Sequence, residues 1–270
     1  LSLEPITQLE NMYSRKSIVS AFAESGFKTY WLSTQELDSW AGFTRVISYD
    51  ADSTYYFERS YDDVVLEKLR NVLNEPYQRK LIVIHLRASH WEYVKRYPAE
   101  FNIFKPADSS WREHLIASYD NSILYTDYIM DAIIKKVAEL PIRSFIFHAS
   151  DHGENLLDDD RQIFGHPFGT EHDLEIPAYI WFSDHAAKQL NGKLQAAARN
   201  SDMPINSNNL AHSMIDIAGI HTPHLDYSKS LFSESFRVGD RMYVMPDKTL
   251  HAYVKPPPPE YPLLMSVWRK

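Results

Sequence analysis

The sequence predicts an α/β fold with a mainly parallel central sheet, helices on both faces and a small edge hairpin near the C-terminus. Helix-like and strand-like segments alternate along most of the chain. The run Lys80–Leu86 is almost uniformly apolar, which is typical of a strand buried on both faces of a parallel sheet. The helical segments between strands are long enough to cross back over the sheet, and such connections favour parallel strands.

The first half of the chain contains two helix-like segments that each precede a strand. Ser17–Ser25 predicts a short helix, because Gly26 is a favoured residue just past a helix end. The aromatic and β-branched residues of Phe27–Ser33 then predict a strand. An amphipathic pattern over Tyr61–Leu73 predicts the helix that precedes the Lys80–Leu86 strand.

The second half contains the longest predicted helix, Ser118–Leu140, which Pro141 ends. Its inward stripe repeats every four residues, at Tyr125, Ile129, Ile133 and Val137. The remaining predicted elements are strands over Ser144–Ala149 and Ile176–Phe182, helices over Asp184–Asn200 and Asn206–Ile217, and a sheet-edge hairpin from Arg241–Met245 and Thr249–Val254. Together these elements predict one domain over residues 1–255 and a proline-rich extension over residues 256–270.

Composition limits the class of protein. A hydrophobic content of 44% is typical of a globular chain, and a formal net charge of -8 argues against a general nucleic-acid binder, which needs a basic surface. The absence of cysteine excludes disulfides and thiolate zinc sites. No apolar run approaches the roughly 20 residues of a membrane span. Because the chain opens at Leu1 instead of Met, we expect a fragment or a processed domain, soluble as it stands.

The most informative motif is Asp151-His152-Gly153-Glu154, which follows the apolar strand Ser144–Ala149. In open α/β sheets, ligands bind just outside the carboxyl ends of the strands. Carboxylate oxygens and imidazole nitrogens both suit zinc, and Gly153 allows the backbone to turn sharply beside an ion. The motif therefore indicates a metal-dependent enzyme.

Three further segments place polar side chains at predicted strand ends or in loops. They are His85–His90, the loop Phe164–Gly169 with His166, and Asn208–His212. Convergence of several such segments on one sheet edge is what an active site requires.

Each motif also has a structural interpretation. The Asp-His-Gly-Glu sequence can be a surface turn, and His90 can be an ordinary loop residue. His85 lies inside an apolar strand, which favours a hydrogen-bonded core histidine over a ligand. His212 is expected to cap or pack its helix, whereas the constrained Gly165-His166-Pro167 loop favours a functional role for His166.

Taken in order, these blocks resemble the catalytic domain of bacterial phosphoethanolamine transferases, which are membrane-anchored enzymes of the alkaline phosphatase and sulfatase superfamily. The resemblance runs from about Ser14 to Phe236 and implies an alkaline phosphatase/sulfatase-like fold. The blocks that carry it are Gly26–Ser33 with Gln35, His85–His90 with Tyr93 and Arg96-Tyr97-Pro98, Tyr119–Asp127, Ser150–Glu154 with Gly165-His166, Ile176-Pro177 with Trp181, Asn209–Ile220 and Tyr227–Phe232.

The resemblance implies roles for individual residues. Asp151 and His152 match two zinc ligands, and Glu154 matches an acidic residue that supports them. His90 and His166 match catalytic histidines that contact the phosphoryl group or a second metal, and Arg96 would add positive charge for substrate binding. Ala88 stands where the family commonly has glycine, so we expect a slightly different turn before His90.

The resemblance also implies an activity and a location. Phosphatidylethanolamine would donate phosphoethanolamine to a sugar or sugar phosphate of lipopolysaccharide or a periplasmic glycan, at the periplasmic face of the bacterial inner membrane. The remaining zinc-ligand glutamate, the threonine nucleophile and the membrane region are expected before Leu1, and residues 1–270 alone are expected to be inactive.

Two other hypotheses remain open from the sequence. A phosphoglycerol transferase or a sulfatase-type hydrolase of the same superfamily would share the Asp-His pair. A degenerate, non-catalytic domain that binds a glycolipid or a partner protein would also lack a nucleophile.

Overall fold

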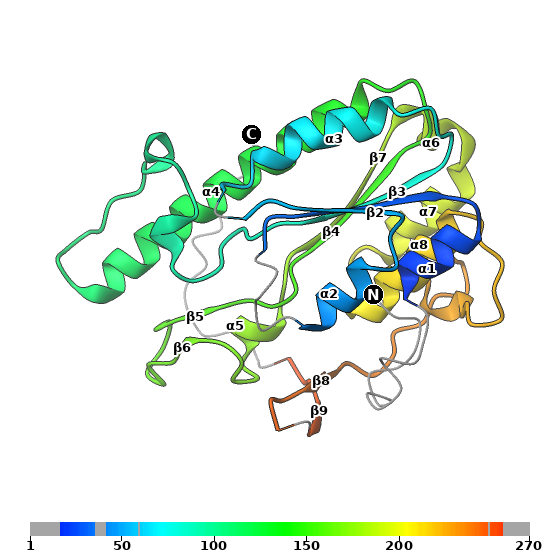
Figure 1. Ribbon diagram of the computed structural model, residues 1–270. Helices are drawn as coiled ribbons and strands as arrows, with labels where there is room; N and C mark the ends of the chain where they lie inside the picture. Colours follow the sequence, from blue (N-terminus) through cyan, green and yellow to red (C-terminus); the bar gives the residue numbers. More distant parts are fainter. Residues whose placement is uncertain (1–16, 36–41, 59, 248, 256–270) are drawn as a thin grey trace.

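The central sheet is formed by three parallel strands, β1 (Lys28–Ser33), β2 (Ser53–Tyr56) and β3 (Lys80–His85), in the order β2-β1-β3 (Figure 1). The protein is described by a computed structural model that covers residues 17–35, 42–58, 60–247 and 249–255. The parallel α/β sheet predicted from the sequence is confirmed. The sequence missed β2 and the helix before it, α2 (Gly42–Ser48), because neither has a long apolar run.

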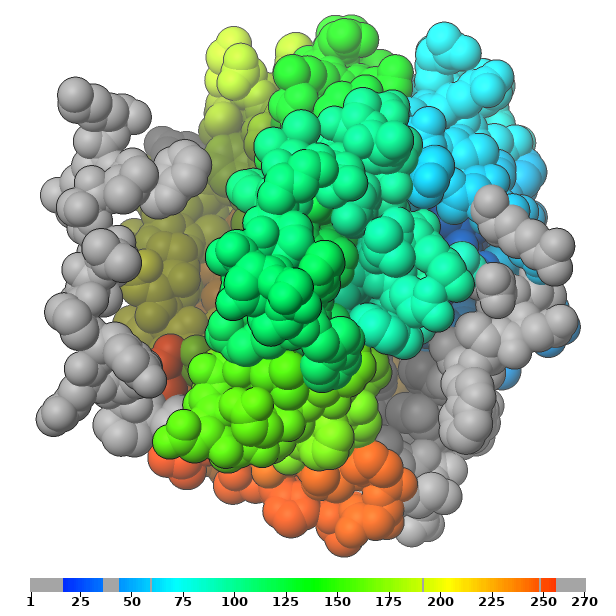
Figure 2. Space-filling model, turned by 90° about the vertical axis from the view of Figure 1, so that its left-hand side faces the viewer, coloured from blue at the N-terminus to red at the C-terminus, as the bar shows by residue number. Residues whose placement is uncertain are grey.

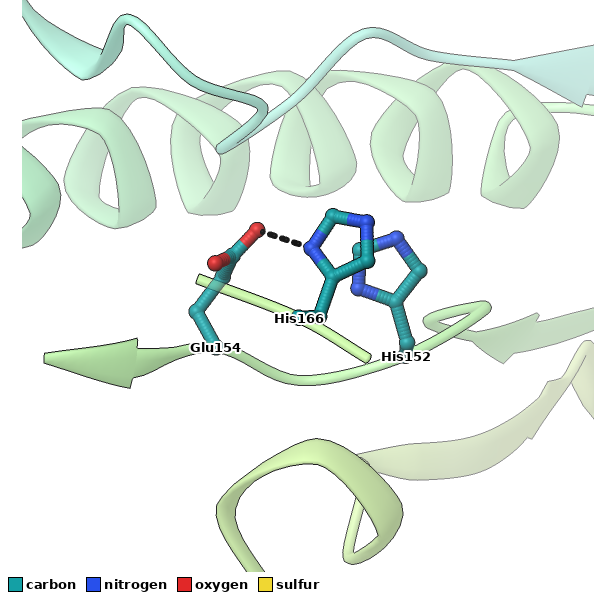
Figure 3. A group of neighbouring side chains, drawn as sticks. All are labelled: His152, Glu154 and His166. Carbon is teal, nitrogen blue, oxygen red and sulfur yellow. Dashed lines mark hydrogen bonds and ion pairs between the residues drawn. The ribbon is translucent and has the colours of Figure 1, made fainter. Parts of the chain in front are cut away.

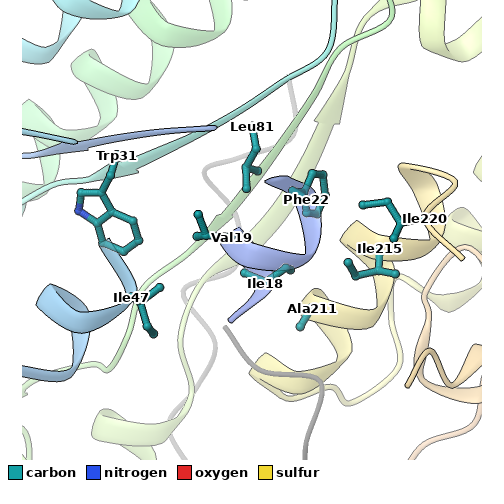
Figure 4. Close-up of a cluster of buried hydrophobic side chains, with 9 residues drawn as sticks. All are labelled: Ile18, Val19, Phe22, Trp31, Ile47, Leu81, Ala211, Ile215 and Ile220. Atoms are coloured by element: carbon teal, nitrogen blue, oxygen red, sulfur yellow. The ribbon is translucent and has the colours of Figure 1, made fainter. Parts of the chain in front are cut away.

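Helices cover both faces of this sheet, as predicted, because successive side chains of a strand point to opposite faces. On one face, Trp31 and Leu81 pack against α1 (Ile18–Glu24) and α8 (Ser207–Ile217) (Figure 4). On the other face, Leu32 packs in a second cluster, whose side chains come mainly from α3 (Val64–Asn74) and α4 (Trp111–Ala138); they include Leu69, Tyr125, Ile129, Met130 and Ile133.

The predicted helix ends agree with local capping chemistry. The Ser17 hydroxyl accepts a hydrogen bond from the Ser20 amide at 3.2 Å at the start of α1. Gly26 follows the end of α1 with φ +80°, a left-handed conformation that glycine adopts readily. Asn206 caps α8 by accepting from the amides of Asn208 and Asn209.

Helix α4 begins at Trp111, seven residues before the predicted start at Ser118. Its first turn exposes Trp111 and Arg112, and the buried Leu115 stands outside the four-residue repeat, which is why the sequence pattern did not reveal this part of the helix. The predicted stripe is confirmed: Tyr125, Ile129, Ile133 and Val137 are all buried.

Ser110 caps α4, because its hydroxyl accepts from the Glu113 amide at 3.3 Å. We expect Ser110→Ala to lower the free energy of unfolding by about 1 kcal/mol, since the amide loses its capping acceptor. Ser110→Asn should retain most of the stability, because asparagine caps equally well. Urea denaturation of the three proteins would measure both effects, and equal losses in the two variants would contradict the capping role.

Strands β4 (Phe145–Ala149) and β7 (Ala178–Phe182) pair with each other in antiparallel orientation, with Phe147 opposite Ile180. The segment between them contains the short helix α5 (Glu171–Leu174) but no crossover helix, so the chain re-enters β7 at the end where it left β4. This pair is therefore an exception to the parallel arrangement.

The C-terminal elements differ in detail from the prediction. The helix predicted over Asp184–Asn200 is two helices, α6 (Asp184–Gln189) and α7 (Asn191–Asn200), because Leu190 leaves the helical conformation. The hairpin of β8 (Met242–Val244) and β9 (Leu250–Ala252) is confirmed, but it forms its own sheet instead of pairing with the edge of the central one. The proline-rich extension, residues 256–270, lies outside the described residues, and the domain boundary stays a prediction.

Candidate metal centre

A small hairpin brings together two parts of the segment that follows β4. Strands β5 (Asn155–Leu156) and β6 (Phe164–Gly165) pair in antiparallel orientation, with Asn155 opposite Gly165. This pairing sets Glu154 beside His166. Figure 2 shows this segment lying against α4, with the β8–β9 hairpin below it.

His152, Glu154 and His166 form a group that can hold a metal ion, since one ligand atom of each lies within 4.8 Å of the others. The two imidazole rings lie side by side with their centroids 3.6 Å apart, and Glu154 Oε1 lies 2.9 Å from His166 Nδ1 (Figure 3). Two imidazoles and a carboxylate match a donor set that zinc uses in catalytic sites.

The hydrogen bonds of the two imidazoles leave one nitrogen of each available to a metal. His152 Nδ1 lies 2.9 Å from the Gly153 carbonyl oxygen, which can only accept, so this nitrogen carries the proton. The carboxylate of Glu154 holds His166 Nδ1 in the same way. In the neutral form of both residues, Nε2 then keeps its lone pair, which is how second-shell partners orient metal-ligating histidines.

The burial of the group is uneven. The side chain of Glu154 is only 7% exposed, whereas those of His152 and His166 are 35% and 33% exposed. Burial and the nearby Glu154 carboxylate raise the pKa of the Tyr93 hydroxyl, which lies on this buried side of the group. The centre thus has an enclosed side at Glu154 and an accessible side at the imidazoles, where a substrate can approach.

Asp151, predicted to be a zinc ligand, lies beside the group of three. Its side chain is 84% exposed, and its Oδ2 lies 3.7 Å from His152 Nε2, outside the group of three. Glu154, predicted to support the ligands, contributes a ligand atom to the group and also holds His166. The metal role of Asp151 stays a prediction.

Gly153 is required by packing, not by a left-handed turn. A Cβ at this position would lie 1.9 Å from the carbonyl oxygen of His172, at the start of α5. The Gly153 amide also donates to the Asp173 carbonyl at 2.8 Å. This close approach of two backbones fixes the position of the residues on either side, His152 and Glu154.

A buried polar network, not predicted from the sequence, supports the His166 loop. The Asp173 carboxylate, on a residue 3% exposed, accepts from Asn155 Nδ2 and from the Phe168 amide at 2.6 Å. Thr170 donates to Asn155 Oδ1 at 2.7 Å and forms a capping box with Asp173. The spacing Thr170-x-x-Asp173 was a signal that could have revealed this network.

His90 lies in the loop after β3, near the group but outside it. Its Nδ1 lies 2.6 Å from the Trp91 carbonyl oxygen, which leaves Nε2 available. The Trp91 ring packs edge-on against Phe164 of β6, with centroids 5.0 Å apart, so the loop lies beside the strand that leads to His166. Arg96 donates to the carbonyl oxygens of His90 and Trp91 at 2.7 and 2.8 Å. The catalytic role of His90 and the substrate-binding role of Arg96 stay predictions.

Two histidines have the structural roles that the sequence favoured. His85 Nδ1 lies 3.1 Å from Ser33 Oγ, the ring packs edge-on against Trp31, and burial lowers the pKa of its imidazole. His212 is 1% exposed, and its Nδ1 accepts from the Asp226 amide at 3.2 Å.

A second group of possible ligands, Asp159, Glu171 and His172, is better explained by ion pairing. Arg161 contacts Asp159 at 2.5 Å and Glu171 at 3.0 Å. Hydrogen bonds from Arg161 lower the pKa of Asp159 to about 2. The guanidinium supplies the positive charge that a metal would otherwise bring.

Within the described part of the chain, we find no helix with the length and apolar character needed to cross a membrane.

Comparison with known proteins identifies the family. The Sulfatase family model matches residues 5–220. Phosphoethanolamine transferase EptC of Escherichia coli K12 is 27% identical over 258 residues, which are 87% of this chain and 43% of that protein. The chain therefore spans less than half the length of this relative.

Solved structures agree with the sequence match. The C-terminal periplasmic domain of Escherichia coli EptC superposes with a TM-score of 0.79 at 26% identity, covering 88% of this chain and 71% of that one. A structure of the same domain in complex with zinc superposes with a TM-score of 0.69 at 25% identity, covering 84% and 68%. The chain belongs to the sulfatase family and is homologous to the periplasmic domains of phosphoethanolamine transferases.

Proposed function

We propose that this chain is the catalytic domain of an enzyme that transfers phosphoethanolamine from phosphatidylethanolamine to a sugar or sugar phosphate of lipopolysaccharide or a periplasmic glycan. The observation that carries the proposal is the His152, Glu154 and His166 group, in a chain similar to EptC over 87% of its length. The proposed location is the periplasmic face of the inner membrane, as for the periplasmic EptC domain.

The residues of the centre would have two different roles, zinc binding and phosphoryl binding. His152 Nε2, with Glu154 and Asp151, would hold zinc, which supplies a Lewis acid for a phosphoryl oxygen. His166 and His90 each keep one ring nitrogen available, as their hydrogen bonds show. When protonated, these nitrogens would donate hydrogen bonds to the phosphoryl oxygens and give a proton to the leaving oxygen.

The exposed side of the two imidazoles is where the donor headgroup would enter. The threonine nucleophile that the resemblance implies would attack phosphorus and release diacylglycerol, and it would carry the phosphoethanolamine group until the acceptor hydroxyl displaces it. In this scheme Glu154 holds His166 in one tautomer through both steps, because it is hydrogen-bonded to Nδ1.

A transfer assay tests the proposal. Phosphatidylethanolamine labelled in its ethanolamine group is incubated with lipopolysaccharide and with either residues 1–270 or the product of the complete coding sequence. We expect zinc-dependent labelling of lipopolysaccharide by the complete product, abolished by a chelator and restored by zinc, and no transfer by residues 1–270 alone.

Other outcomes would assign the alternative functions. Labelled transfer from phosphatidylglycerol alone would indicate a phosphoglycerol transferase, and hydrolysis of an aryl sulfate alone would indicate a sulfatase. Binding of lipopolysaccharide without any transfer by the complete product would indicate a binding module. Each of these results would contradict the proposed function.

A further inference from the structure

The loop that carries His90 is fastened at both ends by charged side chains from outside it. We define the His90 loop as residues 86–91, between β3 and the short helix Tyr93–Lys95. Its first half is held by Asp62, which lies just before α3, and its last two carbonyl groups are held by Arg96.

Asp62 has a buried carboxylate that accepts hydrogen bonds from the backbone of this loop. The residue is 3% exposed. Its Oδ1 accepts from the Arg87 amide at 3.1 Å and its Oδ2 from the Ala88 amide at 2.8 Å. Hydrogen bonds from amides to a charged acceptor are stronger than those between neutral groups. Without them the buried carboxylate would be an unpaired charge, which destabilises the folded state.

Thr34, at the end of β1, links the same groups. Its hydroxyl donates to Asp62 Oδ1 and accepts from the Arg87 amide at 2.8 Å. Thr34 is fully buried, and its own amide donates to the His85 carbonyl at 3.0 Å. The carboxylate is thereby anchored to the central sheet before it reaches the loop.

The backbone of the loop needs this support at Ala88. Ala88 has φ +45°, a left-handed conformation that residues with a Cβ disfavour. The hydrogen bond from its amide to Asp62 holds the turn that follows β3. This turn decides where the chain places His90, two residues later.

The far end of the loop is held against the candidate metal centre. Arg96 holds the carbonyl groups of His90 and Trp91, and the Trp91 ring packs on Phe164, one residue before Gly165 and His166. A shift of the turn at Ala88 would therefore move His90 relative to His166.

We propose that Asp62 is a positioning residue whose buried carboxylate, with Thr34, holds the His90 loop so that the imidazole of His90 faces the transferred phosphoryl group. This inference rests on the proposed function. Asp62 hydrogen-bonds to the loop backbone and to Thr34, so it acts through His90 and not on the substrate.

The test compares Asp62→Asn with Asp63→Asn. Asp62→Asn keeps the shape of the side chain but replaces one acceptor oxygen with an NH₂ group. That donor would face the backbone amides of the loop, which are donors themselves. Asp63 is the adjacent carboxylate and is exposed, which makes it a matched control. In residues 1–270, amide exchange of Arg87 and Ala88 should become at least about tenfold faster in Asp62→Asn, since a lost charge-assisted hydrogen bond has that effect. The exchange of Ile84 in β3 should be unchanged in Asp62→Asn, and that of Arg87 and Ala88 should be unchanged in Asp63→Asn.

Kinetics of the complete product then separate positioning from other effects. We expect Asp62→Asn to lower kcat by about 10- to 100-fold with little change in KM, the size typical of a lost supporting contact. Asp62→Asn combined with His90→Ala should be no slower than His90→Ala alone, because both changes remove the same contribution. If Asp62→Asn does not fold, Thr34→Val should show the same directions with smaller effects.

The possible failures can be told apart. If His90→Ala lowers kcat but Asp62→Asn does not, or if the two losses multiply in the double variant, the positioning role is wrong and the proposed function stands. If His90→Ala leaves kcat unchanged in an active transferase, the role of His90 fails and this inference fails with it. If the complete product transfers nothing, the proposed function itself is overturned.

Discussion

Replacing His152 with alanine should reduce the zinc affinity of this chain on the order of 100-fold or more. His152 Nε2 keeps its lone pair because Nδ1 is hydrogen-bonded to the Gly153 carbonyl, and its ring lies against that of His166. Removing this imidazole leaves only the carboxylates of Glu154 and Asp151 as proposed zinc ligands, too few for a tight site. Calorimetric titration with zinc, supported by the absorption spectrum of bound cobalt, measures the loss.

Two control variants make this result specific. His114→Ala removes an exposed histidine of α4 and should leave zinc affinity unchanged. His172→Ala tests the second group of possible ligands. If zinc affinity falls in His172→Ala and not in His152→Ala, the metal is bound by Asp159, Glu171 and His172, and our assignment of the centre is wrong.

The same titration tests the two carboxylates of the motif. Asp151→Asn and Glu154→Gln each keep the shape of the side chain and remove its charge. If the exposed Asp151 coordinates zinc, both variants should bind zinc more weakly than the native chain. If only Glu154→Gln weakens binding, Glu154 is the carboxylate ligand, as the distances in the group of three favour, and the predicted role of Asp151 is contradicted.

Replacing Gly153 with alanine should lower the free energy of unfolding by about 3 kcal/mol, the upper end of the usual cost of overpacking. The new methyl group would lie 1.9 Å from the His172 carbonyl oxygen, so one of the two backbones must move. Either movement would weaken the 2.8 Å hydrogen bond between the Gly153 amide and the Asp173 carbonyl. Urea denaturation measures the loss, and zinc titration should show weakened binding in the folded variant.

Gly192→Ala is the matched control for this experiment. Gly192 lies in α7, and a Cβ there would meet nothing within 4 Å. Alanine is favoured over glycine within a helix by roughly 0.5–1 kcal/mol, so this variant should be as stable as the native chain or slightly more stable. If Gly153→Ala behaves like Gly192→Ala, the close approach of α5 does not restrict this position.

The sequence by itself determined the parts of the fold that local patterns specify. The apolar run Lys80–Leu86 identified the strand β3, whose side chains enter the clusters on both sides of the sheet, although only Leu81 is fully buried. The four-residue repeat from Tyr125 to Val137 identified the buried face of α4. The motif around His152 and the loop around His166 were also visible, because chemistry-bearing residues follow apolar runs directly.

Only the tertiary structure decided how distant segments meet. The antiparallel pairing of β4 with β7, the contact of Glu154 with His166, the Asp62 hydrogen bonds to the His90 loop and the need for glycine at position 153 all depend on residues that lie 10 or more positions apart. Local propensity acts over a few residues, whereas these contacts are set by packing and by the need to pair buried polar groups. The candidate ligands were therefore visible in the sequence, and the folded chain determined which of them come together.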